Sequence, residues 1–239
     1  MQARHTVFDH ILFAVLLLIP LIERYITWPR LLARLNTGEE NVRLHFYRAS
    51  ILSQWLLTGY LVAIWAGRPW HWLLLTASSP LRLGLGLAVA LGIVLLFRSQ
   101  RKHALESERA MDHARRQFEY AVPLLPHTAA ENRLFHLVSV TAGICEELLF
   151  RGFLYWYLAL WTGPVAAAIL SSLIFGLGHI YLGVAHVPKA GLAGLFFACV
   201  ALASGALWPA MIIHAAMDWN SGELGFRILS RPPLPEPGA

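Results

Sequence analysis

The sequence predicts an all-α fold in which about seven helices, within a range of roughly six to eight, cross a membrane. Of its 239 residues, 57% are hydrophobic and only 14% are charged, and the mean hydropathy is +0.54. Soluble globular chains are roughly 45–50% apolar and about 25% charged. The apolar residues also gather into runs close to the roughly 20 residues that a membrane helix needs. Together these observations predict a polytopic transmembrane helical bundle.

The candidate membrane helices follow from the apolar runs. They cover residues 8–22, 50–66, 82–97, 134–157, 164–181, 190–204 and 206–221. The first run is expected to stay in the protein as a helix, because no small-residue cleavage site of a signal peptide follows it. The connections among the last four runs are only a few residues long, which predicts a compact C-terminal bundle.

Polar segments divide the chain into three parts. We expect N-terminal membrane helices over residues 1–133, a compact helical core over residues 134–221 and a disordered, proline-rich tail over residues 222–239. In the first part, residues 98–133 combine good helix formers with mixed charge. This segment predicts either a cytoplasmic amphipathic helix at the membrane surface or a solvated extension of the third span.

The distribution of Lys and Arg predicts the orientation. The loop 23–49 holds five arginines and the loop 98–133 holds seven basic residues, whereas the loop around Arg68 and Arg82 holds two. The positive-inside rule places the two basic loops in the cytoplasm and the N-terminus outside. The heavy use of arginine over lysine is typical of a GC-rich genome. We therefore expect a multi-pass protein of a bacterial inner membrane, with no nucleic-acid partner.

Three charged residues lie inside the fourth apolar run, which begins at residue 134. A charge at the centre of a bilayer helix costs about 2.5–3.5 kcal/mol, so Glu146, Glu147 and Arg151 need partners or a watered cavity. Glu147 and Arg151 are at positions i and i+4, with the acid first, which favours an ion pair. Glu146 lies about 100° around the helix and faces other helices. A purely structural polar network explains the same residues and stays open at this point.

Histidines and a further acid lie in the later spans. His179 follows Phe175 by one helical turn, and His214 and Asp218 are at positions i and i+4 in the last span. Taken singly, a membrane histidine such as His179 is more often a packing residue than a catalyst, and the His214–Asp218 pair is as compatible with a structural role as with a catalytic one. With Glu146 they form a set of carboxylates and histidines, and such groups can share a water and deprotonate it. The convergence of these residues indicates a catalytic site.

The motifs that hold these residues resemble those of a known family. "EELLFR" (Glu146–Arg151), "FGLGH" (Phe175–His179) and "HAAMD" (His214–Asp218) match, in order and spacing, the EExxxR, FxxxH and HxxxN/D motifs of the CAAX-processing and bacteriocin-immunity (CPBP or Abi) intramembrane proteases. The resemblance covers about residues 134–221 and includes similarity to the type 2 CAAX prenyl endopeptidases. It implies a membrane endopeptidase whose site opens toward the cytoplasm and whose substrate is a membrane-embedded or membrane-associated protein or peptide.

The resemblance also implies roles for the residues. Glu146 would activate water with His179 as its partner, and His214 and Asp218 would stabilise the tetrahedral oxyanion. The other glutamate and the arginine of the EExxxR motif would be a structural ion pair. The best-understood members have Asn at the position of Asp218, and an ionised carboxylate repels an oxyanion.

Metal dependence is the alternative mechanism. The glutamate mechanism needs no cofactor. Glu146, His179, His214 and Asp218 are nevertheless a plausible Zn²⁺ ligand set, because catalytic zinc takes about three nitrogen or oxygen ligands plus water. The sequence has no HExxH motif, which favours the metal-free reading.

Two other functions compete with proteolysis. A bacteriocin-immunity or peptide-binding membrane protein would hold a peptide in the same site without cutting it. A proton or solute transporter would use the intramembrane acids and histidines as a relay. The chain lacks paired broken helices in two matching halves, which disfavours the transporter.

Overall fold

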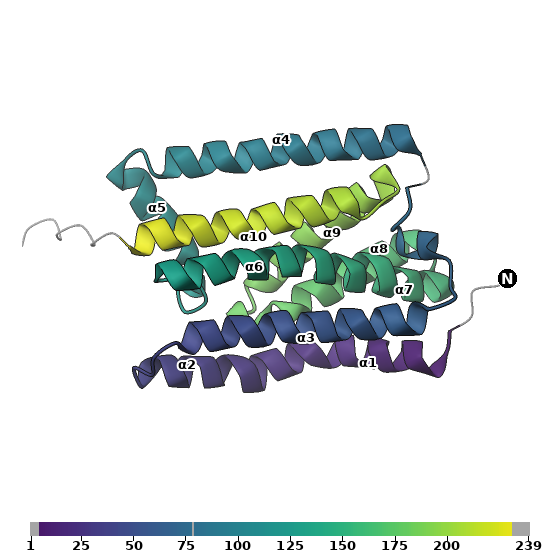
Figure 1. The fold of residues 1–239 in the computed structure, drawn as a ribbon, viewed down its shortest axis with the longest axis horizontal. Coiled ribbons are helices and arrows are strands. Elements are labelled where there is room, and N and C mark those ends of the chain that lie inside the picture. The colour runs from purple at the N-terminus through teal and green to yellow at the C-terminus, as the bar shows by residue number, and fades with distance from the viewer. Residues whose placement is uncertain (1–4, 78, 231–239) are drawn as a thin grey trace, which may run out of the picture.

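The computed structural model of the protein describes residues 5–77 and 79–230, and these residues form helices and connecting turns without any strand (Figure 1). Long helical rods lie along the longest axis of the molecule, and the short helix α5 lies at one end. The prediction of an all-α helical bundle is confirmed.

The N-terminal half supplies three long rods and one short helix. Its elements are, in chain order, α1 (Val7–Ile22), η1 (Glu23–Thr27), α2 (Trp28–Asn36), α3 (Val42–Trp65), η2 (Trp70–Leu73), α4 (Pro80–Ala104), α5 (Glu108–Phe118) and η3 (Glu119–Ala121). The first three are one continuous rod, with π-helical η1 in its middle. The start of α4 is fixed by the Ser79 hydroxyl, which accepts a hydrogen bond from the Arg82 N–H, and by Pro80 in the first turn.

The C-terminal half supplies the remaining rods. Its elements are α6 (Ala129–Glu146), η4 (Glu147–Leu154), α7 (Tyr155–Thr162), α8 (Pro164–Gly178), η5 (Ile180–Leu182), α9 (His186–Ser204) and α10 (Trp208–Leu229). The first three again form one continuous rod, with π-helical η4 between two α-helical parts. Thr128 and Glu131 form a capping box at the start of α6, which satisfies its first backbone N–H groups.

The prediction of a loop over residues 23–49 is wrong for most of this range. Helix α2 continues the first rod to Asn36, and α3 begins at Val42. Helix α2 buries Trp28 and Leu31 while its arginines face outward, so a polar composition is compatible with an amphipathic helix here.

The segment 98–133 combines both predicted alternatives. Helix α4 extends beyond its apolar part to Ala104, and α5 is a separate amphipathic helix that buries Met111 and Ala114.

The predicted tail at 222–239 begins too early. Helix α10 continues to Leu229, because Glu223 accepts hydrogen bonds from Arg227 at 2.6 Å and from Asn132 of α6 at 3.0 Å. The rest of the predicted tail, residues 231–239, lies outside the described residues.

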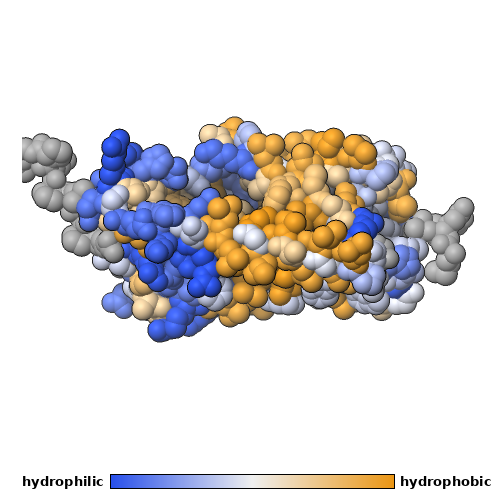
Figure 2. All heavy atoms as spheres, turned by 90° about the horizontal axis from the view of Figure 1, so that it is seen from above, coloured by the Kyte–Doolittle hydropathy of each residue, from blue (hydrophilic) through white to orange (hydrophobic). Residues whose placement is uncertain are grey.

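The surface has the apolar character of a membrane protein. Three helical segments are long and apolar enough to cross a membrane, namely Val7–Asn36, Pro80–Ala104 and His186–Ser204, and Pro164–Gly178 is apolar but shorter. Figure 2 shows apolar residues gathered over a broad part of the α4 face and hydrophilic residues gathered toward one end. An apolar surface of this size is unusual for a soluble monomer and is typical of contact with lipid.

The central rod holds the bundle together. Helix α6 packs against α10 and α3, and α7 and η4 pack against α8. At Gly143 the approach of α10 is so close that an added Cβ would lie 2.7 Å from the Ala215 Cβ and 2.8 Å from the Met211 carbonyl oxygen. This contact brings the end of α6 to the middle of α10, where the motif residues lie.

Candidate active site

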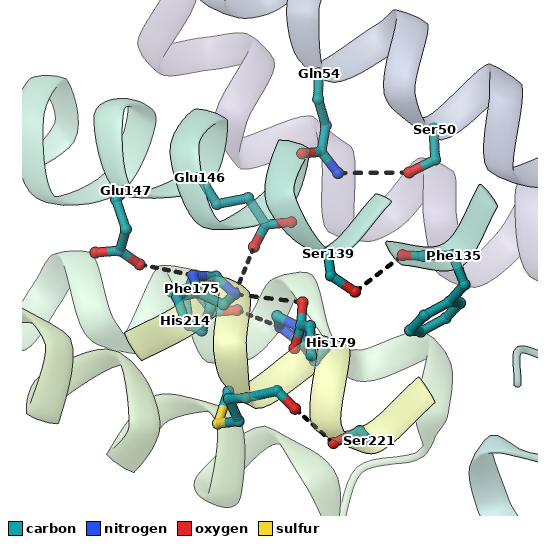
Figure 3. A network of polar contacts seen from close by, with 12 residues as sticks. Ser50, Gln54, Phe135, Ser139, Glu146, Glu147, Phe175, His179, His214 and Ser221 are labelled. Carbon is teal, nitrogen blue, oxygen red and sulfur yellow. Dashed lines mark hydrogen bonds and ion pairs between the residues drawn. The ribbon is translucent and has the colours of Figure 1, made fainter. Parts of the chain in front are cut away.

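The motifs meet where α6 passes into η4, on the side that packs against α8, α9 and α10 (Figure 3). Glu146 is the last residue of α6 and Glu147 is the first of η4, whose wider turn includes a bond from the Tyr155 N–H to the Phe150 carbonyl. Short π-helical turns inside α-helices occur frequently at functional sites. The two neighbouring glutamates differ in environment: the Glu147 side chain is 0% exposed and that of Glu146 is 22% exposed.

Glu147 and Arg151 form the ion pair that their spacing predicts, and it is buried. Arg151 Nη1 donates to Glu147 Oε1 at 3.0 Å. The guanidinium also lies 4.1 Å from the centroid of the Phe175 ring, a cation–π contact that gives the FxxxH phenylalanine a position in the site. Gly194 of α9 makes this possible, because a Cβ there would lie 2.7 Å from Arg151 Nη2. Arg151 is thus enclosed by η4, α8 and α9.

His214 connects the two glutamates with Asp218. Its Nδ1 lies 2.8 Å from Glu147 Oε1, and because a carboxylate only accepts, Nδ1 carries the proton. This bond turns Nε2 toward Glu146 Oε2 at 4.0 Å and Asp218 Oδ2 at 3.7 Å. The ring also stacks on Phe197 of α9, with centroids 4.8 Å apart. The orientation of His214 is therefore set on two sides.

His179 enters from the end of α8. Its Nδ1 lies 3.0 Å from the carbonyl oxygen of Phe175, which only accepts, so Nδ1 is the donor and Nε2 keeps its lone pair. Tyr181 stacks against the ring with centroids 6.2 Å apart and in turn contacts Trp28 of α2 at 5.3 Å. The N-terminal rod therefore reaches the site through Tyr181.

The structure brings three of the four predicted catalytic residues face to face. Glu146, His214 and Asp218 face one another, and the Glu146 and Asp218 side chains are 22% and 33% exposed, so neither is fully enclosed by protein. His179 lies close to them, because the Phe175 ring contacts both histidines and His179 interacts electrostatically with Asp218 and His214. Among the described residues, no hydrogen bond or ion pair joins Glu146 directly to His179.

Some site residues were missed by sequence reasoning. The bond from His214 to Glu147 was not expected, because Glu147 had a sufficient partner within its own helix. Phe197 gave no signal in an apolar run. Glu23 in η1 interacts electrostatically with Glu146, and both carboxylates interact with the Tyr181 hydroxyl. An acid at the end of the first apolar run was a visible signal, but the sequence did not show which helix it faces.

The zinc alternative depends on how closely its candidate ligands are grouped. In the described part of the chain, no three His, Cys, Asp or Glu side chains are grouped closely enough to hold a metal ion. Zinc would require Glu146, His179, His214 and Asp218 to move toward a common centre.

Comparison with known proteins agrees with the motifs. Residues 130–220 match the family model described as type II CAAX prenyl endopeptidase Rce1-like, a range that runs from the start of α6 into α10 and includes all three motifs. Neither a curated protein nor a solved structure matches the chain. The match of residues 130–220 to the Rce1-like family model of type II CAAX prenyl endopeptidases thus agrees with the resemblance that the motifs indicated.

Proposed function

We propose that the chain is an intramembrane endopeptidase that hydrolyses a peptide bond of a membrane-embedded or membrane-associated protein or peptide, using a water activated by Glu146 and His179. The family of residues 130–220 supports a CAAX-type protease in general. The observation that carries the finer proposal is the fixed orientation of His214, whose Nε2 faces Glu146 and Asp218.

The water would be held by two acceptors. Glu146 offers a carboxylate, and His179 offers Nε2 because its Nδ1 donates to the Phe175 carbonyl. The water oxygen attacks the carbonyl carbon of the peptide while its proton passes to Glu146. The C–N bond then breaks and the same proton passes to the leaving amine. General base catalysis of this kind contributes about 10²–10⁴-fold to the rate.

The oxyanion of the tetrahedral intermediate would form at His214. A protonated His214 donates through Nε2, and Glu147 on Nδ1 stabilises the positive ring, as an acid partner does for a catalytic histidine elsewhere. Asp218, 3.7 Å from Nε2, would add a second negative charge that favours this protonated form. In this account Asp218 acts on the oxyanion through His214, which removes the objection that an ionised carboxylate repels it.

Charge and topology support the cytoplasmic side of the membrane as the side on which the site opens. Helix α8 ends at the site, and η5, which follows it, contacts η1 of the first rod. Just beyond η5, His186 contacts Tyr120 of η3, which follows the basic helix α5. The positive-inside rule places basic segments in the cytoplasm. We therefore infer a multi-pass protein of a bacterial inner membrane with the site open on the cytoplasmic side.

The test is a comparison of protein termini. Membranes from cells with the wild-type protein and with Glu146→Gln are analysed by mass spectrometry, with Glu108→Gln on α5 as a control that also removes one carboxylate. New C- and N-termini of a membrane protein should appear with the wild type and Glu108→Gln and be absent with Glu146→Gln. If Glu146→Gln yields the same termini, Glu146 is not the base. If no termini differ while both variants still protect cells against a bacteriocin, the non-cleaving immunity function replaces proteolysis.

A further inference from the structure

A groove of about 340 Å³ lies between α4 and α10, and the catalytic proposal does not use it. Its lining comes from two helices and consists of Val94, Phe97, Arg98 and Arg101 of α4 and Ala215, Ala216, Trp219 and Asn220 of α10. The volume falls at the lower end of the range of small-molecule sites, about 300–1,000 Å³.

The groove lies on the opposite face of α10 from the candidate active site. With about 100° per residue, His214 and Asp218 share one face of the helix, and the four lining residues of α10 centre on the other. Helix α10 therefore contributes residues both to the candidate active site and to the groove. The groove is not an extension of the site that holds His214.

The groove is apolar at one end and basic at the other. Val94 and Phe97 of α4 face the alanines of α10, whereas Arg98 and Arg101 lie one turn further along α4. Arg98 is exposed and Arg101 is half-buried, and within the described residues neither arginine has a hydrogen bond or an ion pair. Two guanidinium groups without a protein partner beside an apolar wall suit an anion that carries an apolar chain.

An unpartnered polar atom also lies in the groove lining. The side-chain Oδ1 of Asn220 is buried and has no hydrogen-bond partner in the part of the chain that the structure describes. Buried polar atoms without partners are uncommon in folded proteins, so a donor from a bound molecule is expected here. A headgroup that carries hydroxyl groups supplies such a donor.

The depth of the groove matches the edge of a bilayer. Residues 80–97 of α4 are about 26 Å long at 1.5 Å per residue, close to the roughly 30 Å of a hydrocarbon core. Arg98 and Arg101 then lie at the level of the headgroups. Trp219, 41% exposed, lies at the same end of the groove, and tryptophan is enriched at this depth. Figure 2, viewed from the α4 side, shows the apolar surface giving way to hydrophilic residues toward this end.

We propose that this groove is a binding site for one anionic phospholipid. Its phosphate contacts Arg98 and Arg101, its headgroup hydroxyl donates to Asn220 and one acyl chain lies along Val94, Phe97 and the alanines of α10. Charge complementarity selects a lipid of net negative charge over a zwitterionic one, whose headgroup carries its own cation.

The test measures lipid binding rather than proteolysis, so it is independent of the proposed function. The full-length protein in mild detergent is titrated with phosphatidylglycerol or phosphatidylcholine of identical acyl chains, and bound lipid is counted by native mass spectrometry. Variants are Arg98→Gln with Arg101→Gln, which removes the charges, and Ala216→Phe, which fills the apolar end. The matched control is Arg109→Gln with Arg116→Gln on α5, which removes the same charge at exposed positions outside the groove.

The wild type and the α5 control should bind one phosphatidylglycerol in preference to phosphatidylcholine. Loss of both groove arginines should weaken phosphatidylglycerol binding by roughly 30-fold, because each arginine near the headgroups contributes about fivefold. Ala216→Phe should weaken the binding of both lipids. Equal binding of the two lipids, or a groove variant that binds like the control, overturns the proposal. Displacement by inorganic phosphate would assign a free-phosphate site instead, and displacement by an apolar peptide with a C-terminal carboxylate would assign a substrate groove.

Discussion

At the scale of residues, Glu147 has two partners rather than one. Its Oε1 accepts from Arg151 at 3.0 Å and from His214 at 2.8 Å. The arginine compensates the charge of the carboxylate, and the carboxylate in turn fixes the histidine. The Glu147–Arg151 pair, which was predicted to be structural, therefore also positions the imidazole ring of His214 that the proposed mechanism uses.

The first residue-scale prediction concerns Asp218. Asp218→Asn should keep at least about a tenth of the cleavage rate, because an amide can donate to an oxyanion directly. Asp218→Ala should lose roughly 10²–10³-fold, because without this carboxylate His214 is less readily protonated and the oxyanion loses its donor. The measurement is initial cleavage rate per folded molecule on a substrate found by the terminus comparison, with Asp112→Asn on α5 as the control. An Asn variant as inactive as the Ala variant would require a charged Asp218.

Metal removal provides the second prediction. The glutamate mechanism uses no metal, so incubation with a zinc chelator followed by buffer exchange should leave the cleavage rate of wild type and Asp218→Asn unchanged. The zinc mechanism predicts the opposite result, in which activity falls and returns with added Zn²⁺. Metal content of the purified protein, measured on the same samples, shows whether any metal was present to remove.

The third prediction separates folding from chemistry. Arg151→Ala leaves Glu147 as a buried carboxylate without its cation, and breaking a buried pair destabilises by roughly 3–5 kcal/mol. We expect low yield and a lower melting temperature in detergent, whereas Arg109→Ala at an exposed position should behave like wild type. A fully stable but inactive Arg151→Ala would instead give the arginine a direct catalytic role.

At the scale of elements, the close approach of α6 and α10 determines the site. Gly143 lies one turn before Glu146, and Ala215 follows His214, so the contact of these two small residues sets the distance between the two helices at the site. The small residues occur where helices approach closely in membrane proteins.

The fourth prediction tests this approach. In Gly143→Ala the new Cβ would lie 2.7 Å from both the Ala215 Cβ and its backbone nitrogen, so α6 and α10 must move apart and Glu146 must move away from His214. Cleavage should fall at least about tenfold, since small misplacements of reacting groups have large effects on rate. Adding Ala215→Gly should restore part of the loss. Gly84→Ala on α4, where nothing lies within 4 Å, is the control and should be neutral.

The sequence predicted the features that depend on spacing within one helix and missed the contacts that depend on how the helices pack. The helices, the Glu147–Arg151 pair and the shared face of His214 and Asp218 follow from spacing within one helix. The contact of His214 with Glu147 depends on how α10 packs on α6, which periodicity does not encode. Helix α2 was read as loop because its arginines masked a narrow apolar stripe, and the end of α10 was read as tail because its pairing with Asn132 is a long-range contact.

At the scale of the whole molecule, the family-matched segment packs against the N-terminal half of the chain. Helices α3 and α4, which lie outside residues 130–220, pack against α6 and α10. The segment that connects the two halves is tied back to α3, where Tyr47 donates to the Leu124 carbonyl at 2.6 Å and Arg43 to that of Pro123 at 3.0 Å. The N-terminal half is therefore packed directly against the helices of the family-matched segment.

The fifth prediction follows from this dependence. A fragment of residues 126–239 expressed alone should be degraded, because its apolar faces toward α3 and α4 have lost their partners. Expression together with a fragment of residues 1–125 should restore its level in the membrane fraction, measured by immunoblot against the intact chain. Accumulation of the shorter fragment alone would show that residues 130–220 fold independently.

The π-helical turn of η4 has a consequence for how the chain tolerates insertions and deletions. An α-helix rotates by about 100° for each residue added or removed. The wide turn of Glu147–Leu154 holds about one residue more than an α-helix needs for the same rotation. Deleting one residue there would let the turn relax to an ordinary one and leave Glu146 near its present phase relative to α7, whose Trp156 and Tyr157 are fixed in the core. Inserting one residue would instead rotate Glu146 by about 100° relative to α7. We therefore expect this stretch to accept many apolar substitutions and a single deletion better than a single insertion, so that its constraint is one of helical phase rather than of composition.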